Sequence, residues 1–113
     1  MTPLFTSDVK FKKDIAAIES PLEKVLKMRG TTYNWKTNEF KDKNFPEGKH
    51  HGVIAQELEQ ILPEAVQTTA EGEKAVAYNE IIPVLIEAIK EQQKQITDLK
   101  AELQAFKASF QSK

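Results

Sequence analysis

The residues most able to do chemistry lie near the start of the chain, where Ser7 is followed by several lysines. A serine hydroxyl becomes a nucleophile when a base takes its proton, and a lysine can be that base if burial keeps its amine neutral. The candidate bases are Lys10, Lys12 and Lys13. A solvated leader into the first folded element is the simpler interpretation, and a serine–lysine pair at this spacing is a weak signal.

The spacing of these residues does not select one lysine. In a β-strand, Ser7 and Lys12 point to opposite faces because they are an odd number of residues apart. In an α-helix, their side chains are about 140° apart, and Lys10 is nearer to the serine. Ser7 can therefore reach Lys12 only through a turn or across chains.

A pair of adjacent histidines, His50 and His51, is the other group that could do chemistry. Zinc ligands on a helix are found at positions i and i+4, and no acidic partner lies at ligand spacing from this pair. We therefore expect a structural or hydrogen-bonding histidine before Gly52. Neither a metal site nor a cofactor is predicted.

The composition limits the classes of function. The chain has 113 residues, a formal net charge of −1 and no cysteine. Because it has no basic excess, we expect no nucleic-acid partner bound through its phosphates. The lack of cysteine excludes disulfides, thiolate catalysis and cysteine zinc sites. No apolar run is long enough to cross a membrane and the first residues do not resemble a secretory signal, so we expect no membrane partner.

An α-helix followed by a β-strand is predicted after the serine–lysine stretch. Ser20 is placed to cap the helix and to form a capping box with Glu23, and Gly30 is placed to end it. The alternating β-branched and aromatic residues that follow predict a strand. Tyr33 and Trp35 lie on this strand, and we expect both in the core.

A loop, a second helix and a hairpin complete the predicted body. The polar stretch Thr37–His50 is expected to protrude as a loop or an irregular hairpin tip. The apolar spacing over residues 54–62 predicts a helix that Pro63 stops. A turn at Glu71–Gly72 predicts a hairpin whose returning strand carries Tyr78. Together these elements predict a small mixed body of the α+β class.

The last third of the chain predicts a long helix with a coiled-coil seam. Asn79 can cap this helix, and Pro83 falls in its first turn. Apolar residues recur with a three–four spacing, broken only by Gln92. Position a is held by Ile82, Ile89, Ile96, Leu103 and Phe110, and position d by Leu85, Gln92, Leu99 and Phe106. Because such a helix overhangs a small body, we expect parallel self-association, and the pattern leaves the number of chains open.

Four stretches of the sequence, taken together, are similar to one known family. They read SDVKFKKDI, KVLKMRGTTYNW, HGVIAQELEQILPEAV and VAYNEIIPVLIEAIKEQ. In this order and spacing they resemble the intramolecular chaperone autoprocessing domain at the C-terminus of phage tailspikes and endosialidases. Similar domains occur in bacterial surface fibres and in a membrane-bound transcription factor of animals. The resemblance runs from about Ser7 to Glu91, and the predicted coiled coil continues beyond it.

The resemblance implies a chaperone that forms a homotrimer, aligns three upstream fibre segments and then releases itself. Cleavage is expected at the Thr6–Ser7 bond, with Ser7 as nucleophile and Lys12 as general base. Asp8 is expected to cap a turn or to orient Lys12, and a backbone N–H to hold the oxyanion. Assembly is expected to order the site and bury the base. The implied fold is an α+β body with a projecting loop, for which Thr37–His50 is the candidate, and a three-stranded parallel coiled coil.

The expected organisation has three parts. Residues 1–6 are the remnant of an upstream segment, residues 7–78 are the α+β chaperone body, and residues 79–113 are the coiled-coil helix. Because only six residues precede the serine, we expect an excised or processed piece of a phage tail or bacterial surface fibre precursor. The alternatives are a structural trimerisation cap that does not cleave, and a coiled-coil adaptor that binds a foreign partner through its loop.

Overall fold

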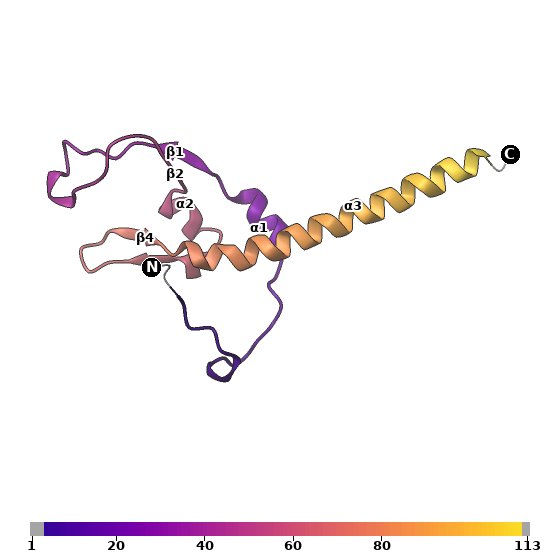
Figure 1. The fold of residues 1–113 in the computed structure, drawn as a ribbon, viewed down its shortest axis with the longest axis horizontal. Helices are drawn as coiled ribbons and strands as arrows, with labels where there is room; N and C mark the ends of the chain where they lie inside the picture. Colours follow the sequence, from indigo (N-terminus) through magenta and orange to yellow (C-terminus); the bar gives the residue numbers. More distant parts are fainter. Residues whose placement is uncertain (1–3, 112–113) are drawn as a thin grey trace.

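A small α+β body carries a long projecting helix in the computed structural model, which describes residues 4–111 (Figure 1). The molecule measures 74 × 40 × 31 Å. Helix α3, Ile81–Gln111, accounts for most of the longest dimension, because its 31 residues extend about 45 Å at the usual helical rise. The predictions of an α+β fold and of a long C-terminal helix are therefore confirmed.

Two small antiparallel sheets form the β part of the body. Strand β1 (Thr31–Tyr33) pairs with β2 (His50–Gly52), and β3 (Val66–Thr68) pairs with β4 (Lys74–Val76). The second pair is the predicted hairpin. Its turn holds Gly72 at a φ of 82°, a conformation that glycine adopts without a Cβ clash.

Short helices connect these strands. Helix α1 (Pro21–Lys27) precedes β1, and helix α2 (Ala55–Glu59) follows β2. Residues 4–111 also contain four single turns of 3-10 helix: η1 (Val9–Phe11), η2 (Lys41–Lys43), η3 (Pro63–Ala65) and η4 (Tyr78–Glu80). The predicted second helix is therefore real but shorter, and Pro63 starts a new turn after it.

The predicted capping box of α1 is wrong. Ser20 has a left-handed φ of 48°, and its side chain makes no capping hydrogen bond. Its carbonyl instead accepts a hydrogen bond from the backbone N–H of Lys24. Glu23 forms an ion pair with Lys27, one helical turn on. The helix also ends before Gly30, because Met28 is already extended.

Two further boundaries differ from the sequence prediction. Tyr78 lies in the turn η4 and not on the returning strand, since β4 ends at Val76. Asn79 belongs to the same turn, and α3 begins at Ile81. Pro83 falls in the first turn of α3, as predicted.

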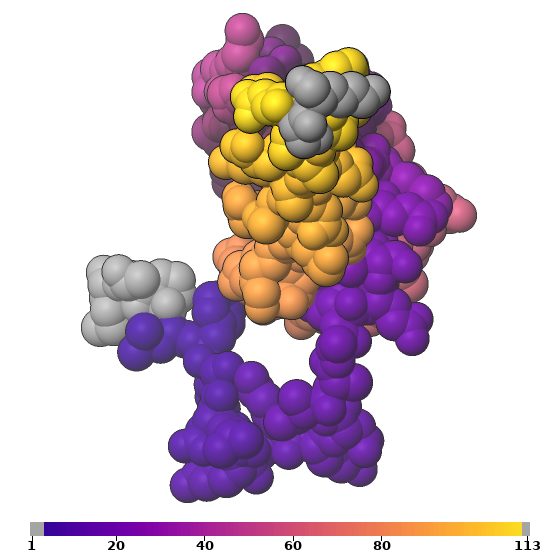
Figure 2. Space-filling model, turned by 90° about the vertical axis from the view of Figure 1, so that its right-hand side faces the viewer, coloured from indigo at the N-terminus to yellow at the C-terminus, as the bar shows by residue number. Residues whose placement is uncertain are grey.

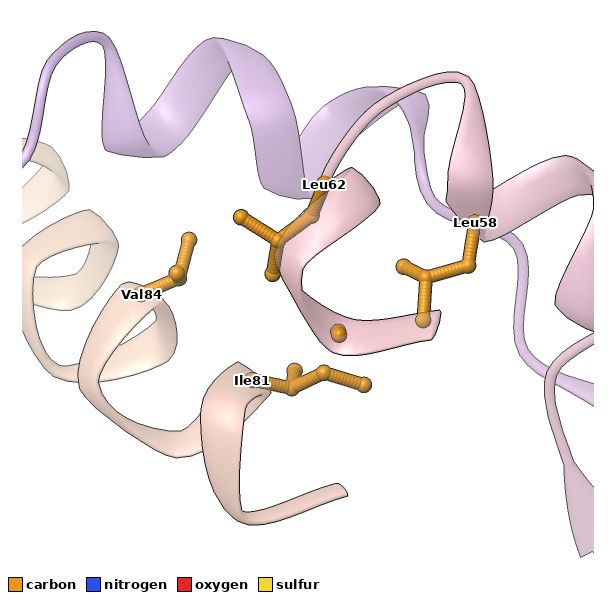
Figure 3. Close-up of a cluster of buried hydrophobic side chains, with 5 residues drawn as sticks. Leu58, Leu62, Ile81 and Val84 are labelled. Carbon is orange, nitrogen blue, oxygen red and sulfur yellow. The ribbon is translucent and has the colours of Figure 1, made fainter. Parts of the chain in front are cut away.

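The core lies where α2, η3 and the start of α3 meet (Figure 3). Its buried side chains are Leu58, Leu62, Ala65, Ile81 and Val84. Helix α1 packs along α3 and adds the partly buried Val25. Burying a side chain of leucine size stabilises a fold by about 1.5–3 kcal/mol, so this cluster is the main source of cohesion in so small a body.

Beyond Glu91, α3 leaves the body, and every described side chain from residue 92 to 111 is exposed (Figure 1). These include the apolar side chains of the predicted seam, such as Ile96 and Leu103. Within this chain the apolar stripe is therefore uncovered.

The segment between β1 and β2, residues 34–49, projects from the body as the expected loop (Figure 1). Trp35 lies in it, 37% exposed, and stacks on Phe45 with ring centroids 4.2 Å apart. The prediction that Trp35 is a core residue is wrong, because β1 ends at Tyr33 and the tryptophan packs within the loop. Tyr33 is partly buried, and its ring forms a T-shaped pair with the Trp35 ring.

Candidate functional site

The serine–lysine stretch lies in an exposed segment, residues 4–17, which we call the arm. Every side chain in the arm is exposed. The arm loops out from the body and forms a separate projection in the space-filling view (Figure 1, Figure 2). Backbone bends at Asp14 (φ 56°) and Ser20 (φ 48°) flank its junction with the body. Ile18, just after the arm, packs against the core cluster.

Ser7 and Lys12 lie next to each other in the arm. The Lys12 Nζ donates a hydrogen bond to Ser7 Oγ across 2.7 Å. The two side chains meet within one chain, through the 3-10 turn η1. Lys10, a competing candidate base, places its Nζ 5.2 Å from the centre of the Phe11 ring. The structure therefore brings Lys12 to the serine, although the spacing alone left the choice open.

Asp8 caps the turn that joins the two residues. Its carboxylate accepts a hydrogen bond from the backbone N–H of Lys10 at 3.0 Å. Its carbonyl accepts from the N–H of Phe11 at 3.1 Å, and the Val9 carbonyl accepts from the N–H of Lys12 at 3.0 Å. Three successive backbone N–H groups are thus already bonded within the turn. A backbone donor for an oxyanion must come from another residue.

The geometry of the pair suits proton transfer, but its surroundings do not. A hydrogen bond between hydroxyl and amine is the path by which a lysine would take the serine proton. General-base action requires the neutral amine, which burial favours and water opposes. Ser7 and Lys12 are both exposed. The arm therefore brings Ser7 and Lys12 into contact but leaves both side chains exposed to water.

A second cluster joins the loop base to the start of α3. The Tyr78 hydroxyl accepts a hydrogen bond from the backbone N–H of Val53 at 3.3 Å. A Cβ placed on Gly52 would lie 2.7 Å from that hydroxyl oxygen and 3.1 Å from Cε1 of Tyr33. Sequence reasoning missed this contact, although both residues fall in stretches that resemble the family. The close approach of the Tyr78 hydroxyl explains why position 52 needs a glycine.

His50 and His51 both lie on β2, but in different surroundings. His50 packs beside the Tyr33 ring, with centroids 5.8 Å apart, and its buried Nε2 has no hydrogen-bond partner. His51 is exposed on β2. Among residues 4–111, no group of three or more potential metal ligands lies together. In the same range, no helix has the length and apolar character needed to cross a membrane.

Ion pairs link separate elements of the body. Arg29 forms a two-pronged hydrogen-bonded pair with Glu57 at 3.0 and 2.6 Å, joining the end of α1 to α2. This pair raises the pKa of Arg29 and lowers the pKa of Glu57, chiefly through the hydrogen bonds. Lys43 in the loop reaches Glu73 in the β3–β4 turn at 3.0 Å, which raises the pKa of Lys43.

The structure thus combines a small α+β body, an exposed serine–lysine arm and a long helix whose apolar stripe is uncovered within the chain. Residues 7–67, more than half of the sequence, match the family described as chaperone of endosialidase. This chain belongs to that family, as the sequence predicted. The match begins at Ser7. The family is also named as a peptidase family.

Related proteins are components of phage tails. The chain is 37% identical over 87 residues to long tail fiber protein Gp37 of Escherichia phage AR1, covering 75% of this chain and 8% of the relative. It is 34% identical over 105 residues to long tail fiber protein Gp37 of Salmonella phage S16, covering 90% and 14%. The chain thus spans a small part of the length of these relatives. Their names agree with the predicted location in a phage tail.

Proposed function

We propose that this chain is the self-releasing chaperone of a phage tail fibre. Three copies assemble through α3, the upstream fibre chains fold on them, and each chain then cuts its own Thr6–Ser7 bond. Family membership and the fibre relatives support the chaperone role. The observation that carries the release step is the 2.7 Å hydrogen bond between Lys12 Nζ and Ser7 Oγ.

The first chemical step is an acyl shift from nitrogen to oxygen. Neutral Lys12 takes the hydroxyl proton of Ser7, and the Oγ attacks the carbonyl carbon of Thr6. The C–N bond to Ser7 then breaks, and Lys12 returns the proton to the departing nitrogen. The product is an ester between the Thr6 acyl group and Ser7 Oγ. Nucleophile and target belong to one chain, which gives the attack a high effective concentration.

The second step is hydrolysis of that ester. Lys12 takes a proton from a water molecule, which attacks the same carbonyl carbon. The C–O bond to Ser7 breaks and the serine oxygen recovers its proton. The fibre then ends in the carboxylate of Thr6, and the released chaperone begins with the free amine of Ser7. No cofactor takes part in this scheme.

The assembly step rests on the uncovered stripe of α3. Ile89 is 65% exposed and Leu99 is 63% exposed, and the stripe continues to Phe110. An apolar stripe of three–four spacing on a helix is buried by copies of itself in a coiled coil. In this proposal the parallel trimer aligns three fibre chains at residues 1–6. Residues 7–78 form the chaperone body and residues 79–113 the coiled-coil helix.

The release step is tested on a precursor in which a fibre segment precedes this chain. Intact mass is measured for the wild type and for Ser7→Ala, Lys12→Ala and Lys12→Arg. Lys12→Arg keeps the positive charge and a hydrogen-bond donor, but a guanidinium cannot act as a base. Lys13→Ala is the matched control. We expect cleavage before Ser7 in the wild type and the control, and an intact precursor in the other three.

The same samples separate the proposal from its alternatives. Light scattering is expected to give the mass of a trimer in every sample. If the wild-type trimer stays uncleaved, the chain is a structural cap that remains on its fibre. If Lys12→Arg is cleaved as fast as the wild type, the lysine is not the base. A monomer in every sample refutes the assembly step.

A further inference from the structure

One polar side chain interrupts the uncovered apolar stripe of α3. Gln92 is the single polar residue among the nine seam positions of this helix. Its side chain makes no hydrogen bond within residues 4–111, whereas the next residue, Gln93, donates from Nε2 to the Thr97 hydroxyl at 3.4 Å. The amide of Gln92 therefore has N–H donors and a carbonyl acceptor to offer, and nothing in the described chain takes them.

The body does not cover this position of α3. Val84 and Ala88, earlier in the helix, are each only 3% exposed. From residue 92 onward every described side chain of α3 is exposed, because the helix has left the body (Figure 1). Gln92 is thus the first seam residue beyond the body. Within one chain its amide faces water, and in the proposed assembly its partners come from other copies of α3.

Packing along the stripe would enclose the Gln92 amide between apolar layers. The seam residues on either side are Ile89, one turn before, and Ile96, one turn after, which are 65% and 41% exposed in the single chain. The positions that flank the seam here, e and g, are held by the uncharged Gln93 and Gln95. The layer therefore has no charged side chain at its flanking positions, and a polar group enclosed in it needs hydrogen-bond partners.

We propose that the three Gln92 amides of the trimer bind one monovalent anion, a halide such as chloride, at the axis of the seam. The inference rests on the proposed function, which supplies the parallel trimer. A symmetric assembly presents the same group three times. A ring of amides, each donating to the next carbonyl, uses one N–H of every side chain and leaves the second without an acceptor. An anion at the centre accepts the remaining N–H groups in charge-assisted hydrogen bonds, which are stronger than neutral ones.

The composition of the layer favours a halide over a metal cation. A cation is held by carboxylates or by several free carbonyl oxygens, and the positions at this layer carry no carboxylate. The carbonyls of the three Gln92 side chains are already acceptors in the ring. The cost of taking an ion out of water also falls as its radius grows, so a large monovalent anion enters an apolar seam more readily than a small cation.

Side-chain amide NMR signals of the full chain test the site directly. Sodium chloride replaces sodium methanesulfonate, whose anion is bulkier, at constant total concentration. The Gln92 signals, identified by their absence in Gln92→Leu, are expected to shift with chloride and to saturate. Gln93→Leu is the matched control, because it makes the same change one residue on, outside positions a and d, and its Gln92 signals should respond as in the wild type. Gln92 signals that do not respond to chloride overturn the proposal and leave a ring of amides alone.

The dependence of assembly on chloride gives the number of anions bound. One anion per trimer predicts that the association constant, from sedimentation at several dilutions, rises about tenfold for each tenfold increase in chloride above the dissociation constant of the anion. Gln92→Leu is expected to lose this dependence. A trimer whose association does not depend on chloride refutes the anion site and leaves the proposed function standing. A monomer by light scattering refutes the assembly step and the anion site with it. A trimer that responds to chloride but stays uncleaved supports the anion site and refutes the release chemistry alone.

Discussion

Adding a single methyl group to Gly52 tests the contact between the loop base and α3. In Gly52→Ala the new Cβ would lie 2.7 Å from the Tyr78 hydroxyl oxygen, whereas ordinary contacts begin at 3.4 Å. The hydroxyl must move away, and its 3.3 Å hydrogen bond with the N–H of Val53 is lost. Tyr33 Cε1, at 3.1 Å, must also give way.

The cost of Gly52→Ala has two parts. Loss of the hydrogen bond costs about 1 kcal/mol, and crowding in a packed site costs about 1–3 kcal/mol. In Tyr78→Phe the hydroxyl is absent, so the hydrogen bond is already lost and the closest clash is gone. We therefore expect the two substitutions to be non-additive, with Gly52→Ala costing about 1 kcal/mol less in the Tyr78→Phe background.

Urea unfolding of the four proteins of this cycle, at one protein concentration, gives the coupling. A fixed concentration is needed because the proposed assembly would make apparent stability depend on protein concentration. Equal costs of Gly52→Ala in both backgrounds would refute the close contact with the hydroxyl. A stabilising effect of Gly52→Ala in the wild-type background would show that the site has room for a side chain.

Three further predictions concern the core, the ion pair and the helix. Leu58→Ala is expected to lower the free energy of unfolding by about 2–5 kcal/mol in urea titrations, because Leu58 is 2% exposed, and a near-neutral result would contradict the core assignment. Arg29 lowers the pKa of Glu57, so the pair stabilises the fold above the ordinary carboxyl pKa and this contribution disappears as pH falls through the lowered value. Glu57→Gln should remove that part of the acid dependence in thermal melts across pH 3–6, whereas an unchanged profile would count against the pair. Gln92→Leu replaces the polar residue of the seam and is expected to raise the melting temperature of the assembly at fixed concentration, and a lower value would contradict the predicted register.

The long helix could be predicted from sequence because its evidence is periodic and extends over many residues. The three–four spacing from Ile82 to Phe110 is long enough that one exception does not change the prediction. Helix α3 contains this whole stretch. Its start could not be placed as well, because Asn79 has the right chemistry for a cap but lies in a separate turn. The predicted cap at Ser20 is wrong for the same reason. A single residue's preference for capping did not determine the backbone at this position, where Ser20 takes a left-handed conformation before α1.

The serine–lysine contact could be predicted only through the family resemblance. Neither helical nor strand periodicity brings Ser7 to Lys12, and a 3-10 turn is too short to leave a periodic pattern. Asp8 was the local signal, because an aspartate at this place can bond the backbone N–H of Lys10 and start a turn. The alternation of Tyr33 and Trp35 predicts that both lie in the core, but alternation does not show where a strand ends. The partner strand β2 has only three residues, so β1 ends with it.

The exposure of the arm also makes it a target for cleavage by other proteases. Extended, solvent-exposed segments are the preferred sites of proteolytic nicking. Lys10 lies in this exposed stretch, and a cut on its carboxyl side would separate Ser7 from Lys12. Under the proposed function, a chain cut there keeps its folded body but can no longer release its fibre.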